Sequence, residues 1–244
     1  MKRAERHHLK ENPVEQLVWE LREATIGHSR AATLTALIVL VAAAAAGGYL
    51  YWRGRAAARA DAMLAVAMTM AETPVVAPPA GAPPNQAPTP QTFPSERARW
   101  EAALARYLEV VQAYPSSRAA TSALYEAANA LAALGRAAEA EQRYREVMTR
   151  EGTSIYGQMA SLGLADLRCS TGEYDQAIDL YKQLSAAADT RLPVDGVLMQ
   201  LGRAYAKAGK SDEAASTYTR VVEEFPQSLY VADARTALES VRKR

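Results

Sequence analysis

Apolar positions in the C-terminal part of the chain follow helical spacing and repeat with a fixed period. Ala140 is followed by Tyr144 and Val147, at intervals that place the three side chains on one face of a helix. Equivalent triplets recur every 37 residues, at Ala103, Tyr107 and Val110, at Ala177, Tyr181 and Leu184, and at Ala214, Tyr218 and Val221. Three glycines keep the same interval, five residues before the alanine: Gly135, Gly172 and Gly209. A period of this length predicts stacked helix–turn–helix units.

A different apolar pattern lies nearer the N-terminus. No residue from Ala31 to Trp52 is charged, and these 22 residues reach about 33 Å as a helix, enough to cross a hydrocarbon core of about 30 Å. Tyr49, Tyr51 and Trp52 suit the membrane–water interface at one end. The pattern predicts a transmembrane helix at 31–52, with a cleavable signal peptide as the alternative, because the alanine run at 42–46 offers small-residue cleavage sites.

The residues before this span form a basic N-terminal tail, residues 1–30, with six basic and five acidic side chains. Val14, Leu17 and Leu21 fit an amphipathic helix lying on the membrane surface, and a solvated tail fits these residues equally well. A single span after a short tail favours a cytoplasmic N-terminus.

Residues 53–72 predict a juxtamembrane helix that continues the span. Residues 73–94 hold eight prolines, which exclude a helix and indicate a spacer, an insertion or a docking site for a proline-recognising groove. The repeat domain occupies 95–244 and ends in a capping helix at 228–242.

Helix 97–113 has the features of the second helix of a repeat, but its first helix would fall within the proline tract. An unpaired repeat helix would leave its apolar face in water. We therefore expect residues 56–72 to pack against this helix in place of the missing partner.

Composition excludes several classes of function. The net charge of +1 provides no basic field for nucleic acid. No histidine follows His28, and the chain has no Gly-rich phosphate loop and no group of residues with metal-ligand spacing. The one cysteine, Cys169, fits a small buried side chain better than a reactive thiol. We expect no catalytic residues, no metal and no cofactor, and hence not an enzyme.

The repeated positions resemble the tetratricopeptide repeat, most completely in the third copy, which has Leu201-Gly202, Tyr205, Gly209, Ala214, Tyr218, Val221 and Pro226. The resemblance implies an all-α protein in which a single transmembrane helix precedes an α-solenoid of about 37-residue units. The second copy departs from the pattern, since the polar Arg168 occupies the usual aromatic position.

In this family the first helices of the units line a groove that binds proteins or peptides. Carrying the groove positions onto this chain gives seven candidate binding residues: Tyr125, Asn129, Met159, Leu162, Asp166, Met199 and Arg203. The family's clamp for peptide carboxylates needs several converging basic residues, and only Asn129 and Arg203 resemble it here, so we do not expect that clamp. Protein or peptide binding is the favoured use of the groove, and a solvated face that binds no peptide is the alternative.

The complete layout resembles the YfgM-like bacterial family, ancillary subunits of the Sec translocon. The resemblance rests on the tail, span and repeats, with Arg6-His7-His8-Leu9-Lys10-Glu11-Asn12, Tyr114-Pro115-Ser116-Ser117 and Phe225-Pro226-Gln227-Ser228. It implies an inner-membrane scaffold of chaperone or translocon-associated type, with a periplasmic repeat domain and with the Sec translocon and periplasmic chaperones as partners. The alternative is a structural subunit of an envelope machine for secretion, motility or outer-membrane assembly.

Overall fold

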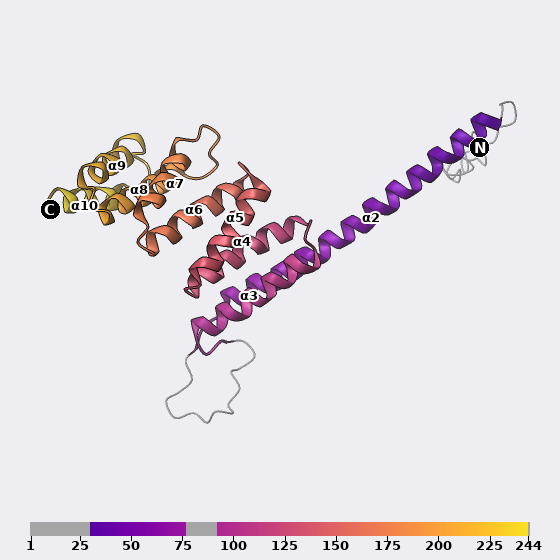
Figure 1. Ribbon diagram of the computed structural model, residues 1–244, viewed down its shortest axis with the longest axis horizontal. Coiled ribbons are helices and arrows are strands. Elements are labelled where there is room, and N and C mark those ends of the chain that lie inside the picture. Colours follow the sequence, from indigo (N-terminus) through magenta and orange to yellow (C-terminus); the bar gives the residue numbers. More distant parts are fainter. Residues whose placement is uncertain (1–29, 77–91, 244) are drawn as a thin grey trace, which may run out of the picture. The chain divides into compact units, whose positions relative to one another are not determined.

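The computed structural model describes residues 30–76 and 92–243 (Figure 1). These residues are helical apart from short connections and one isolated bridge pair, which confirms the all-α class. The chain divides into two compact units, residues 1–55 and 56–244. The predictions for the tail at 1–29, including its amphipathic helix, lie outside the described residues, as does 77–91 of the proline tract.

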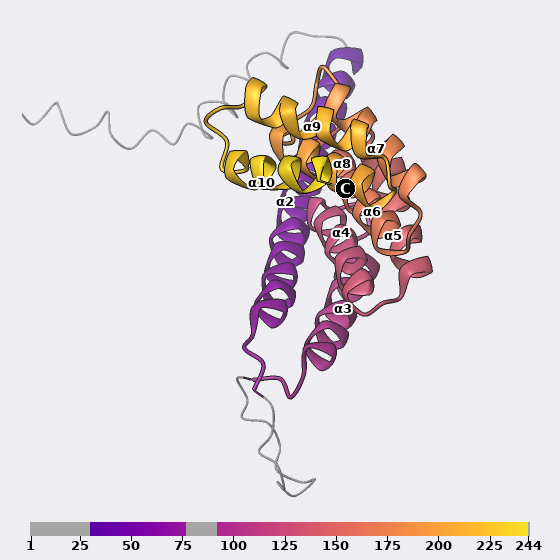
Figure 2. The same ribbon diagram turned by 90° about the vertical axis from the view of Figure 1, so that its left-hand side faces the viewer.

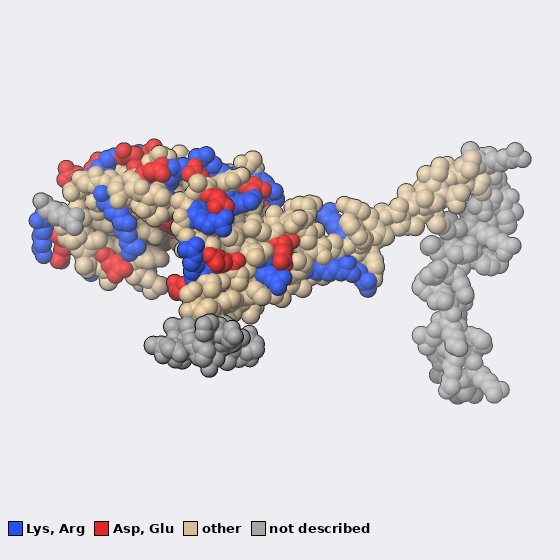
Figure 3. All heavy atoms as spheres, turned by 60° about the horizontal axis from the view of Figure 1, so that its bottom comes forward, with Lys and Arg blue, Asp and Glu red and all other residues tan. Residues whose placement is uncertain are grey.

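The described part of the first unit belongs to one apolar helix, α2 (Arg30–Glu72), which continues into the second unit. The large apolar side chains between Leu34 and Trp52 are 57% to 67% exposed. Figure 3 shows a stretch of this helix with neither acidic nor basic atoms. Among the described residues, α2 is the helix long and apolar enough to cross a membrane, with a mean hydropathy of 2.0 in its apolar window.

The second unit contains three helix pairs, preceded by α3 and followed by α10, stacked in chain order (Figures 1 and 2). The bounds are α3 (Glu96–Ala113), α4 (Arg118–Ala133), α5 (Ala137–Glu151), α6 (Ile155–Ser170), α7 (Tyr174–Ala186), α8 (Val194–Lys207), α9 (Ser211–Glu224) and α10 (Val231–Arg242). Each of these helices packs against the next, and α6 also contacts α4 and α8. The predicted helix–turn–helix units are therefore confirmed.

Serine caps and glycine turns set several helix ends. The Ser117 side chain accepts a hydrogen bond from the Ala120 N–H and so begins α4, and Ser154 does the same for α6. Gly135 lies in the left-handed region with φ of 74°, which lets the chain leave α4 and enter α5 without strain. At α9, by contrast, Ser211 is the first helical residue rather than the cap, and no side chain caps this helix.

The repeated alanines and aromatics form the core, as predicted. The alanines of the four triplets have no exposed surface, and their tyrosines are 1% to 3% exposed. The close approach that alanine permits leaves room for one tyrosine ring in each unit.

The C-terminal part of α2 supplies the missing partner of α3. Ala60 and Ala67 have no exposed surface and belong to the same cluster as Ala103 and Tyr107 of α3. Burial, followed by the charges of Glu126 and Glu72, raises the pKa of Tyr107 to about 12. The expectation that residues 56–72 cover this face is therefore confirmed.

A bridge pair closes the connection between α2 and α3. The Val76 N–H donates to the Phe93 carbonyl at 2.9 Å, and the Phe93 N–H donates to the Pro74 carbonyl at 3.0 Å. The two ends of the proline tract are thus held together directly after one helix of the pair and just before the other.

Arg168 occupies its aromatic position as part of an ion network. Its side chain is 12% exposed and pairs with Glu141 of α5 and with Glu173, which directly precedes α7. Arg145 also pairs with Glu141, at 2.6 Å. The guanidinium thereby joins three consecutive helices, a role that ring packing has in the usual repeat.

Candidate protein-binding site on the first helices

The first helices of the three pairs, α4, α6 and α8, form what we call the first-helix face. A pocket of about 320 Å³ opens on this face between α4 and α6. It contains four of the seven candidate residues: Tyr125, Asn129, Leu162 and Asp166. The remaining lining residues are Ala132, Tyr144, Gly163, Leu167 and Ser170.

Asn129 and Asp166 are each held at the pocket wall by the core tyrosine of their own repeat. The Tyr144 hydroxyl donates to Asn129 Oδ1 at 2.7 Å, and the Tyr181 hydroxyl donates to Asp166 Oδ1 at 2.5 Å. Both tyrosines lie 15 residues after their acceptors, so the two bonds are repeats of one arrangement. A buried phenol needs such a partner, and the bond fixes the amide or carboxylate at the pocket wall.

The carboxylate of Asp166 lies in the pocket wall and remains accessible to water. Burial raises the pKa of Asp166, and the hydrogen bond from Tyr181 opposes that rise. No ion pair between Asp166 and a Lys or Arg is present among the residues that the structure describes. The pocket therefore carries an acidic group that the described protein does not neutralise.

Two aromatic rings complete the pocket. The ring centroids of Tyr125 and Tyr144 are 6.3 Å apart with planes tilted by 58°. Tyr125 is half-buried, whereas Tyr144 is 3% exposed. Glu126, next to Tyr125 on α4 but outside the pocket lining, accepts a hydrogen bond from the Asn129 amide at 3.1 Å. The pocket itself thus combines two tyrosine rings with the carboxylate of Asp166.

The other three candidates lie outside this pocket. Met159 is half-buried against the C-terminal core cluster, and Arg203 is exposed near Gln200. Met199 is 2% exposed and belongs to that cluster, so the expectation that it faces a groove is wrong. Met199 lies 37 residues after Leu162 in the repeat, but its flexible thioether fills the core instead.

Tyr144 and Gly163 also line the pocket, although neither is among the seven predicted candidates. Tyr144 belongs to the core and to the pocket, because its ring is buried while its hydroxyl donates a hydrogen bond to Asn129. A buried phenol needs a hydrogen-bond partner, and this need could have indicated that Tyr144 contacts a pocket residue.

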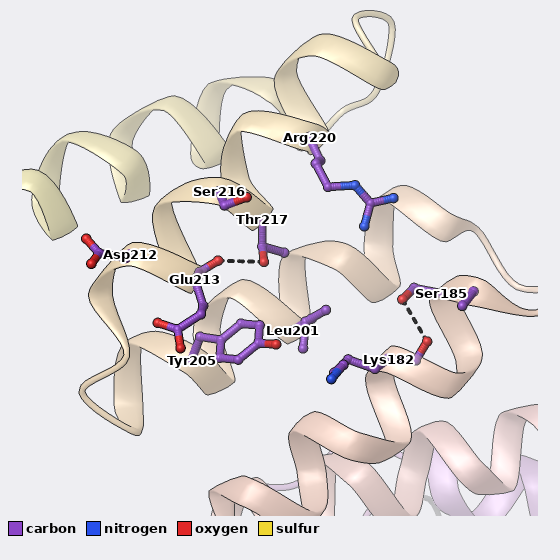
Figure 4. Close-up of a pocket in the computed structure, with 10 residues that line it drawn as sticks. Lys182, Ser185, Leu201, Tyr205, Asp212, Glu213, Ser216, Thr217 and Arg220 are labelled. Carbon is purple, nitrogen blue, oxygen red and sulfur yellow. Dashed lines mark hydrogen bonds between the residues drawn. The ribbon is translucent and has the colours of Figure 1, made fainter.

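A larger pocket of about 510 Å³ lies among α7, α8 and α9 (Figure 4). Lys182 comes from α7, Tyr205 from α8, and Glu213 and Arg220 from α9. Charges of both signs line it, and none of the seven candidates does.

Chemistry beyond binding finds little support in the described residues. No group of three or more His, Cys, Asp or Glu side chains there is placed to hold a metal ion. Burial raises the pKa of the half-buried Cys169 thiol, which disfavours the reactive thiolate.

Comparison with known families identifies the repeats. Residues 160–194 and residues 197–228 each match a family model described as tetratricopeptide repeat. These two segments comprise α6 with α7 and α8 with α9, the pairs built on the 37-residue period.

Solved tetratricopeptide-repeat structures have partial similarity to the chain. One from Parabacteroides merdae is 16% identical, with a TM-score of 0.49, over 61% of this chain and 56% of that one. The kinesin-light-chain-like repeats of Podospora anserina are 20% identical, with a TM-score of 0.48, over 59% and 86%. The present chain therefore spans little more than half the length of the first. No curated protein sequence matches it.

Proposed function

We propose that this chain is a membrane-anchored scaffold that binds protein segments on its first-helix face. Tetratricopeptide repeats are typical of protein-binding scaffolds rather than enzymes, and the chain has two such matches. The observation that carries the proposal is the pocket that gathers Tyr125, Asn129, Leu162 and Asp166. Its half-buried apolar surface and its fixed polar groups are features of a recognition site.

The membrane part of the proposal is supported by the apolar, exposed stretch of α2. Large apolar side chains in water are costly, and a bilayer would cover them. At its end Tyr51 lies under the Arg55 guanidinium, 4.9 Å from ring centroid to Cζ, an arrangement suited to the headgroup layer. We place the N-terminus in the cytoplasm and the repeats in the periplasm, beside the Sec translocon and its chaperones, as in the YfgM-like family.

Site-specific photocrosslinking tests the binding surface. The photoreactive residue p-benzoylphenylalanine replaces Leu162 in the pocket, and a matched variant carries it at Gln142, exposed on α5. We expect crosslinks to several exported proteins from the first position and few from the second. One stoichiometric folded partner would instead indicate a structural subunit of an envelope machine, and equal crosslinking from both positions would refute the first-helix face as the binding surface.

Extraction of the membranes tests the anchor. The chain should resist alkaline carbonate, and its intact mass should include α2. Release as a soluble protein that lacks about the first 46 residues would show cleavage of a signal peptide and would contradict the anchor.

A further inference from the structure

We propose that the pocket between α4 and α6 holds a lysine or arginine side chain of the bound protein segment. This inference rests on the proposed function and adds the chemistry of the ligand. It comes from three features of the pocket: its charge, its aromatic wall and the way that both are held in place.

The charge of the pocket favours a cation. Asp166 contributes a carboxylate, Glu126 lies beside the amide of Asn129, and no Lys or Arg lines the pocket. The carboxyl groups of Glu126 and Asp166 also act on the phenols nearby, since they help to raise the pKa of Tyr125 and Tyr144 after burial. A peptide carboxylate would meet negative charge here, opposite to the basic clamp known in other tetratricopeptide-repeat proteins.

The hydrogen bonds of the site leave acceptor capacity at the carboxylate. The described hydrogen bond to Asp166 uses Oδ1, which accepts from Tyr181. A carboxylate has lone pairs on both oxygens, so Oδ2 can accept from an ammonium or guanidinium group. Because Tyr181 fixes the carboxylate, less conformational freedom is lost when the cation binds.

The aromatic wall suits the rest of such a side chain. Tyr125 presents the face of a half-buried ring in the pocket, packed against the buried ring of Tyr144, and a cation near a ring face is attracted by its quadrupole. Leu162 and Ala132 supply apolar surface for the methylene stem. A neutral apolar side chain could pack on this wall but would leave the Asp166 carboxylate without a cation to pair with.

The environment of the Asp166 carboxyl, compared with that of Asn129 in the neighbouring repeat, also favours a cationic ligand. Burial raises the pKa of the Asp166 carboxyl, the hydrogen bond from Tyr181 opposes that rise, and the residue stays exposed at the pocket. The neighbouring repeat has Asn129 in the equivalent position, bonded to Tyr144 in the same manner, so the fold accepts a neutral residue there. Folding therefore does not require an acid in this position, and the carboxylate of Asp166 is available for a ligand.

The test measures binding of the full-length chain, in detergent, to an array of 13-residue peptides with one varied central residue. The probes carry lysine, arginine, norleucine, glutamine or glutamate in a constant Gly/Ser/Leu context. We expect lysine and arginine peptides to be retained about five- to thirtyfold more than norleucine peptides, the gain from one ion pair and one cation–π contact.

Substitutions of two pocket residues, each with a matched control substitution, sharpen the test. Asp166→Asn should abolish the preference for basic peptides with unchanged helicity, because Asn129 shows that the fold accepts the amide. Asp179→Asn, the same change at an exposed site on α7 outside the pocket, should keep it. Tyr125→Leu should reduce the preference, whereas Tyr125→Phe, which keeps the ring, should retain most of it.

The outcomes separate this inference from the proposed function. Equal retention of lysine and norleucine peptides, together with crosslinks from position 162, would overturn the basic-side-chain assignment and leave the binding face intact. No retained peptide and no crosslink would overturn both. Asp166→Asn behaving like the parent in a folded chain would also refute the assignment.

Discussion

Gly163 is a sensitive test of how the pocket is packed. A Cβ added there would lie 2.6 Å from Cε1 and 2.7 Å from Cζ of Tyr144, whereas ordinary contacts begin at 3.4 Å. The ring would have to move by about 0.8 Å, the difference between 3.4 and 2.6 Å. Tyr144 is 3% exposed and its hydroxyl is bonded to Asn129, so such a movement strains the core and the hydrogen bond together.

The magnitudes decide the sign of Gly163→Ala. Alanine gains about 1 kcal/mol of helix propensity over glycine. Overpacking costs about 1–3 kcal/mol, and losing the hydrogen bond costs about 1 kcal/mol more. The free energy of unfolding should therefore fall by about 1–3 kcal/mol. For a unit of this size the melting temperature falls by about 2–4 °C per kcal/mol, or about 2–12 °C in all.

A double-mutant cycle, followed by circular dichroism during thermal and urea unfolding, isolates the contact. In the Tyr144→Leu background the smaller side chain leaves room, so Gly163→Ala should be neutral or stabilising by up to about 1 kcal/mol. The two substitutions should therefore couple by at least about 1 kcal/mol. If Gly163→Ala matches or exceeds the parent in stability when Tyr144 is present, the argued contact does not exist.

Three further changes test the core, the role of α2 and the ion network, and a fourth tests pH linkage. Ala177→Leu enlarges a side chain with no exposed surface and should lower the free energy of unfolding by about 1–3 kcal/mol in urea. Ala67→Leu should cost a similar amount, and parent-like unfolding would remove α2 from the core. Arg168→Gln deprives Glu173 of its cation and should cost about 1–3 kcal/mol, measured by the same unfolding; no loss would mean that the ion pairs add nothing. Because the folded-state pKa of Asp166 is raised, its contribution to stability is present below about pH 4 and lost as pH rises through that pKa. The stability of Asp166→Asn relative to the parent should therefore be greater at pH 7 than at pH 3.5, and no difference between the two would contradict the shift.

The fold was predictable because one local pattern recurs. Period and helical spacing identify the helix pairs and the core alanines and tyrosines, and the absence of a first helix before α3 points to residues 56–72. These features depend on neighbours that are close in sequence or one repeat away. Helix starts are harder to predict, because helix ends fray and a boundary can shift by one or two residues, as at Ser211, which begins α9 instead of capping it.

The candidate site was predictable only in part. Four of seven groove positions meet in one pocket, because the repeat register determines which residues of α4 and α6 share a face. Met199 shares that register but lies in the core, since a long flexible side chain follows the space available to it. The partners of Arg168 come from two other helices, and spacing along one helix does not reveal contacts of that kind.

The repeats differ in charge at one position, which lies 15 residues before the core tyrosine of each unit. Asn129, Asp166 and Arg203 follow one another at 37-residue intervals, so the same position is neutral, acidic and basic in turn. The fold needs the tyrosine ring, whereas the tyrosine hydroxyl can donate a hydrogen bond either to an amide oxygen or to a carboxylate oxygen. In the third repeat the Arg203 charge instead lowers the pKa of Tyr218 against the rise caused by burial. One position per unit thus varies in charge while the core stays the same. Under the proposed function, this position would distinguish protein segments by their charge pattern.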